Sequence, residues 1–139
     1  MPRYDDLTVG QQLPTQTFPV HRVDLVRYAG ASGDFNEIHW NERFALKVGL
    51  PDVIAHGMFT MAQAIRIVTD WIGDPGAVVE YGVRFTRPVV VPDDGIGARI
   101  EVSGKIGALL GDNKVRVDLV ATSLGQKVLG KAVAVVRVP

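Results

Sequence analysis

The chain has 139 residues, contains no cysteine, and carries 15 basic and 15 acidic side chains, so its formal net charge is zero. At this length we expect one domain over residues 1–139, without the basic excess of a nucleic-acid-binding or anionic-membrane surface. The lack of cysteine excludes a thiolate nucleophile, a cysteine-ligated metal centre and a disulfide framework. It is typical of a reducing compartment, and no apolar leader follows Met1, so we expect a cytoplasmic protein without a signal peptide.

The N-terminal half predicts one strand and several helices. Residues 15–22 are expected to be extended, and residues 23–29 predict a short helix with Asp24 in its first turn. A second short helix is expected over 41–48, where Gly49 supplies a C-terminal stop.

Residues 57–72 predict the main helix. The segment is apolar around most of its circumference, interrupted by Gln63, Arg66, Asp70 and two threonines. Arg66 and Asp70 are four residues apart, so we expect them to pair on one exposed stripe. A helix this apolar is typical of a buried core element, and it is too short to be a membrane span.

The C-terminal half is patterned for antiparallel strands. Glycine-containing turns separate runs that are rich in valine, and the apolar residues of 114–120 alternate with charged ones, which predicts one solvated face. The expected strands cover residues 77–88, 98–108, 114–124 and 126–138. One buried helix with such a sheet predicts an α+β fold in which the antiparallel sheet wraps around a long central helix.

One short segment carries acid–base chemistry. Asp34, Asn36 and His39 bring a carboxylate, an amide and an imidazole into one loop, and Gly33 makes the preceding turn permissive. A carboxylate and a histidine held near one water molecule can divide proton transfer between them. The alternative interpretation is an ordinary Asp/Asn turn followed by a histidine at a helix entry.

A second segment, His56-Gly57-Met58, opens the main helix. Gly57 has no Cβ, so a ligand can approach its backbone closely. The free N–H groups at a helix N-terminus are donors for developing negative charge, as the oxyanion hole for a thioester enolate requires. The alternative interpretation is a helix cap followed by a tight turn.

Together the two segments resemble a known enzyme family. SGDFNEIH at residues 32–39, followed by HGM at 56–58, is similar to the motifs of MaoC-like, hydratase-2 type enzymes of the hot-dog fold. Glu37 stands where that family usually has proline, which loosens the turn without removing a catalytic group. The flanking residues 9–10 and 71–77 look most like the catalytic B-type subunit of actinobacterial (3R)-hydroxyacyl-ACP dehydratases of fatty-acid synthase II.

The resemblance implies an activity and a set of site residues. The reaction is the reversible syn hydration of a trans-2-enoyl thioester, on coenzyme A or acyl carrier protein (ACP), to the (3R)-3-hydroxyacyl thioester. The implied residues are Asp34, His39 and Gly57 in catalysis, with Asn36, His56 and Met58 in substrate binding or orientation. Neither a metal nor a redox cofactor is needed, and a single hot-dog domain implies a homodimer or a heterodimer with a related subunit.

Several alternatives stay open. Other hot-dog proteins hydrolyse acyl thioesters, and a non-catalytic acyl-binding subunit of a heterodimeric dehydratase is a further possibility. His56 with His39 and Asp34 forms a two-histidine, one-carboxylate set, although no close histidine spacing supports a metal site. Arg84, Arg87 and Arg99 are candidates for contacts with coenzyme A phosphates or a carrier protein; for any one of them, a solvated strand face is the favoured explanation.

Overall fold

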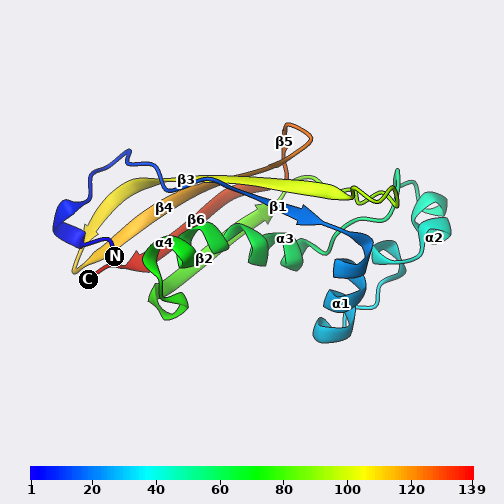
Figure 1. Ribbon diagram of the computed structural model, residues 1–139, viewed down its shortest axis with the longest axis horizontal. Coiled ribbons are helices and arrows are strands. Elements are labelled where there is room, and N and C mark those ends of the chain that lie inside the picture. The colour runs from blue at the N-terminus through cyan, green and yellow to red at the C-terminus, as the bar shows by residue number, and fades with distance from the viewer.

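An antiparallel sheet forms the larger part of the computed structural model, which describes residues 1–139 (Figure 1). Its strands are β1 (Gln16–Val20), β2 (Val78–Phe85), β3 (Ala98–Gly111), β4 (Lys114–Ser123), β5 (Gln126–Lys127) and β6 (Leu129–Arg137). The strand order is β1-β3-β4-β6-β2, and the short β5 pairs with β4. The four predicted strands are thus confirmed, except that 126–138 splits at Val128, whose backbone N–H bonds Ala121 outside the ladder of β6.

The helices lie on one side of the sheet and at one end of it. They are α1 (Arg22–Ser32), α2 (Glu42–Lys47), α3 (Gly57–Ala64) and α4 (Arg66–Ile72), with the 3₁₀ turns η1 (Tyr4–Asp6), η2 (Glu37–His39) and η3 (Pro75–Ala77). In Figure 1, α3 and α4 run in line along the sheet, whereas α1 and α2 extend beyond its far end. This is the α+β hot-dog arrangement that the sequence predicted.

The central helix is broken once, which corrects the prediction of a single helix over 57–72. Ile65 separates α3 from α4. The N–H of Val68 bonds the carbonyl of Ile65 three residues earlier, and the Ile65 N–H is 3.4 Å from the carbonyl of Met61. A bond of the tighter i→i+3 type therefore interrupts the α-helical ladder at this point.

The core lies between the sheet and these two helices. Alternate residues of β3, β4 and β6 are buried, and the strand over 114–120 has the solvated face that its pattern predicted. Ile67 and Val68 of α4 are buried against the sheet. A Cβ at Gly104 of β3 would come within 3.0 Å of Ile67 Cδ1, so the missing side chain lets helix and sheet approach closely.

The predicted ion pair between Arg66 and Asp70 does not form. Arg66 Nη1 donates to Gln63 Oε1 at 2.9 Å, and its guanidinium lies 4.7 Å from the centre of the Phe18 ring. Asp70 accepts a hydrogen bond from Gln16 Nε2 at 3.0 Å. The prediction was wrong because β1 runs beside the helix and offers both side chains other partners.

Strand β2 forms an edge of the sheet and is also attached to the central helix. Its outer backbone edge has no partner strand in the chain. The Tyr81 hydroxyl donates to the carbonyl of Met61 in α3 at 2.7 Å, and burial raises the pKa of this phenol to about 12, so it stays a neutral donor. None of the helices is long and apolar enough to cross a membrane.

Candidate active site

The loop after α1 is built from local hydrogen bonds. Gly33 ends α1 with φ 77°, a conformation that favours glycine. The Asp34 N–H then donates to Ser32 Oγ, the Asn36 N–H to Asp34 Oδ1, and the Ile38 N–H to Asn36 Oδ1, at 3.1–3.2 Å. This run of side-chain-to-backbone bonds turns the chain into η2 without the proline that Glu37 replaces.

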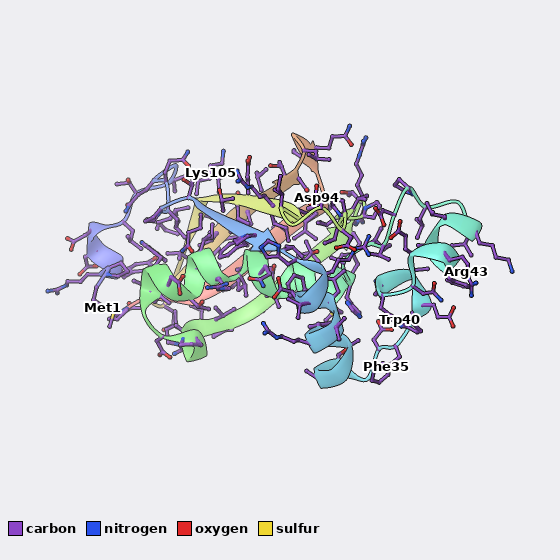
Figure 2. All side chains as sticks on the ribbon, turned by 45° about the vertical axis from the view of Figure 1, so that its right-hand side comes forward. Met1, Phe35, Trp40, Arg43, Asp94 and Lys105 are labelled. Atoms are coloured by element: carbon purple, nitrogen blue, oxygen red, sulfur yellow. The ribbon has the colours of Figure 1, made fainter.

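A further bond closes this loop from outside. The indole N–H of Trp40 donates to the carbonyl of Phe35 at 3.0 Å. Both side chains are exposed, and Figure 2 shows them together at the outer end of the molecule. The loop therefore keeps its shape although most of its residues are solvent-exposed.

His39 is the buried member of the acid–base pair, with 7% of its surface exposed. Its Nδ1 lies 2.7 Å from the carbonyl oxygen of Ile54. A carbonyl only accepts hydrogen bonds, so Nδ1 is the nitrogen that donates, and Nε2 is the one that can offer a lone pair. Nε2 is 3.9 Å from Asp34 Oδ2, which places this second acceptor position beside the carboxylate.

His56 lies behind this pair and contacts both of its members. Its ring stacks on that of His39, with centroids 3.8 Å apart and planes 24° from parallel, and Tyr28 packs on it at 4.7 Å. His56 Nε2 donates to the backbone carbonyl of Asp34 at 3.1 Å. His56 thus joins the start of α3 to the loop that carries Asp34.

The surroundings of the His56 imidazole favour its neutral form. Only 1% of it is exposed, and its Nδ1 has no hydrogen-bond partner. Burial lowers its pKa below the ordinary 6.5, and the charge of His39 acts in the same direction; the Asp34 carbonyl and carboxylate oppose both. A second proton would place a donor without an acceptor in the interior, so the neutral ring is favoured.

Gly57 places free backbone donors next to His39. It is the first residue of α3, and the N–H groups of Gly57, Met58 and Phe59 have no acceptor in the chain. Unpaired N–H groups and the helix dipole give this end of α3 a partial positive charge. His56 is the N-cap residue, but its side chain makes no capping bond, so a simple cap does not explain it.

A pocket of about 340 Å³ opens beside His39 and Gly57. Its wall is mixed in character and comes from the η2–α3 region, from the end of β2 with the segment that follows, and from the β5–β6 junction. The lining residues are His39, Ile54, Ala55, Gly57, Thr60, Phe85, Thr86, Arg87, Pro88, Val89 and Val128. The pocket reaches from the buried imidazole to an exposed rim.

The six predicted site residues divide into two groups. Asp34 and His56 lie next to His39 by the distances given above, and His39 shares the pocket with Gly57; Asp34 and His56 themselves do not line it. Asn36 lies in the same loop, where its side chain caps η2, and Met58 is 58% exposed; neither lines the pocket.

Apart from Arg87, which it names as a candidate contact for a carrier phosphate, sequence analysis missed the far wall of the pocket as a part of the site. Residues 85–89 reach Gly57 because Ile54 forms an antiparallel bridge with Val90, and the Ala55 N–H bonds the carbonyl of Val89. No motif in the sequence announces this pairing of two short loop segments.

The same three side chains are close enough together to be considered as metal ligands. Ligand atoms of Asp34, His39 and His56 lie within 4.8 Å of one another. Stacked imidazoles, however, direct their in-plane lone pairs side by side, whereas a metal needs them to converge at about 2.0–2.1 Å. His39 Nδ1 and His56 Nε2 are also engaged by backbone carbonyls. The arrangement of the three side chains suits proton transfer better than metal binding. That the site works without a metal remains a prediction.

Comparison with known proteins identifies the family of the chain. The MaoC like domain family matches residues 6–123 of the chain. The chain belongs to this family.

Individual relatives resemble the chain over different shares of their own lengths. The 3-hydroxyacyl-thioester dehydratase X of Mycobacterium tuberculosis is 39% identical over 79 residues, which are 57% of this chain and 27% of that protein. Among solved structures, a MaoC-like dehydratase is 45% identical with a TM-score of 0.95, over 99% of this chain and 42% of its own. R-hydratase PhaJ1 from Pseudomonas aeruginosa is 28% identical with a TM-score of 0.85, over 99% and 85%. The chain therefore spans less than half of the first two.

Proposed function

We propose that this MaoC-like domain catalyses the reversible syn hydration of trans-2-enoyl thioesters to (3R)-3-hydroxyacyl thioesters. The observation that carries the proposal is the pair of acceptors, Asp34 Oδ2 and His39 Nε2, held 3.9 Å apart beside the free N–H groups of α3. The names of the similar dehydratase and R-hydratase point to the same class of reaction.

Asp34, His39 and Gly57 each have a role in the proposed hydration. A water molecule donates one hydrogen to Asp34 and the other to His39, which directs its oxygen lone pair at C3 of the enoyl thioester. The thioester oxygen lies at the Gly57 N–H, where the end of α3 stabilises the enolate charge. As the C3–O bond forms, the pair takes up one water proton and delivers one to C2 on the same face. H and OH have then added across the double bond, and dehydration is the reverse.

The direct test uses the purified chain and a short trans-2-enoyl-CoA. We expect loss of the conjugated enoyl absorbance, formation of the (3R) alcohol, and no release of free thiol. Release of thiol without hydration would identify a thioesterase, whose water attacks C1 instead of C3, and would overturn the proposal. Absence of both reactions in the isolated chain and with a co-expressed hot-dog partner would leave an acyl-binding subunit and overturn it equally.

We also propose that the chain works in a pair of hot-dog domains, as a homodimer or with a related subunit. The outer edge of β2 offers unpaired backbone groups to a second sheet. The similar MaoC-like dehydratase, of which this chain covers 42%, has room for a second such domain. The native mass in solution tests the pairing. A substrate carried on coenzyme A or ACP and a cytoplasmic location are two further predictions.

His56 is proposed to act as a positioning residue. His56→Leu removes the N–H that holds the Asp34 carbonyl and the ring that stacks on His39, so both groups lose their alignment. We expect kcat to fall about 100-fold, a loss typical of small misplacements at an active site, with KM changed much less.

The conservative change His56→Gln supplies the control. Its side-chain amide can still donate to the Asp34 carbonyl, so we expect it to recover a substantial part of kcat. Steady-state kinetics of both variants, with circular dichroism to confirm folding, makes the comparison. Equal losses in both variants, or a loss confined to KM, would contradict the positioning role.

A further inference from the structure

We propose that Arg87 binds the phosphate group at the end of the 4′-phosphopantetheine arm that carries the acyl thioester. The inference rests on the proposed function, since it assigns the part of the substrate that is remote from the reacting atoms. This phosphate is shared by coenzyme A and by acyl carrier proteins, so the site recognises the chemistry common to both.

The position of Arg87 follows from the pairing of two loop segments. Ile54 bridges Val90 in antiparallel register, and hydrogen bonds flank this bridge on both sides. Gly57, three residues after Ile54, and Arg87, three residues before Val90, both line the same pocket. This pocket therefore contains the oxyanion donors together with Arg87.

The pocket has a direction that matches a carrier arm. His39, at one end, is buried, Gly57 is half-buried, and Arg87 is exposed to solvent. The wall next to Arg87 includes Phe85 and Pro88, which suit an uncharged chain. An extended pantetheine arm is roughly 15 Å from sulfur to phosphorus, so a thioester at Gly57 leads its phosphate outward to the rim.

The charge of Arg87 is not neutralised within the chain. It is the only Lys, Arg, Asp or Glu residue that lines the pocket. No carboxylate lies within salt-bridge distance, and its Nη1 donates instead to Gln126 Oε1 at 2.6 Å. The neutral amide of Gln126 orients the guanidinium while leaving its charge and its other N–H donors available. Such a planar fork of donors is suited to a phosphate.

The chain also offers a matched control. Arg99 of β3 is likewise exposed and without an ion pair, but it does not line the pocket with His39 and Gly57. Arg99→Gln therefore removes the same charge from the protein and leaves the proposed subsite intact.

The experiment measures hydration of one enoyl group on four carriers of increasing length. N-acetylcysteamine and pantetheine lack the phosphate, whereas 4′-phosphopantetheine and coenzyme A carry it. We expect Arg87→Gln to raise KM about 30-fold for the two phosphate-bearing substrates, the loss expected for a charge-assisted hydrogen bond. KM for the other two substrates and kcat for all four should change less than about twofold, since Arg87 does not touch the reacting atoms. Arg87→Lys should recover part of the affinity, and Arg99→Gln should behave as wild type.

The outcomes separate this inference from the proposed function. An equal rise of KM for pantetheine and phosphopantetheine, no rise for any substrate, or a rise for coenzyme A alone would overturn the phosphate assignment while hydration itself persists. Failure of the wild-type chain to hydrate any of the four thioesters would instead count against the proposed function. Wild-type kcat/KM with enoyl-CoA and with an enoyl carrier protein, each compared with Arg87→Gln, shows which of the two supplies the phosphate.

Discussion

Replacing either acceptor of the pair, by Asp34→Asn or His39→Asn, lowers kcat/KM for enoyl-CoA hydration by about 1,000-fold in our expectation. Each change removes one of the two lone pairs that hold the attacking water and move its proton, and such general acid–base groups contribute about 10²–10⁴-fold. Steady-state hydration rates of the two variants and the wild type measure the loss.

Both substitutions are chosen to keep the fold. Asn at position 34 retains the side-chain oxygen that accepts from the N–H of Asn36, on a residue that is already exposed. Asn at position 39 retains a donor near the place of Nδ1, which His39 uses toward the carbonyl of Ile54. We therefore expect thermal unfolding close to that of the wild type, and a folded variant with near-normal turnover would refute the catalytic assignment. The double variant should lose little more than either single one, because the two groups act as a unit.

The second large effect is expected at Gly57. A valine there shields the backbone N–H and blocks the approach of the thioester oxygen, and loss of one oxyanion donor costs about 10²–10³ in kcat. Gly57 has no positive φ, so the backbone accepts an L side chain without strain. We expect Gly57→Val to fold and to lose activity through kcat, as kinetics at saturating substrate will show.

Phe85 requires a control of its own. A Cβ on Gly57 would lie 3.1–3.2 Å from three carbons of the Phe85 ring, so the ring has to move by a few tenths of an ångström. Because Phe85 is 55% exposed, it has room to do so. Adding Phe85→Ala to Gly57→Val removes this contact, and we expect activity to stay low. Recovery to the level of Phe85→Ala alone would assign the loss to displacement of the ring rather than to the oxyanion donor.

Local sequence accounts for much of the site. Asp34 and His39 lie close because hydrogen bonds between near neighbours hold the turn between them. Ser32 Oγ accepts from the Asp34 N–H, and Asn36 Oδ1 accepts from the Ile38 N–H. The prediction failed where distant strands intervene: Arg66 and Asp70 are suitably spaced, but Phe18 and Gln16 of β1 take up their side chains.

The sequence by itself determined the composition of the site: a carboxylate and an imidazole five residues apart in one loop, and the N-terminus of the main helix. Only the tertiary structure decided how these groups can act. It brings His56 against the ring of His39, turns Nδ1 of His39 to the carbonyl of Ile54, and brings Arg87 to the pocket that Gly57 lines. These contacts join segments far apart in the chain, and they form only when burial of a common core outweighs the entropy of closing the loops between them.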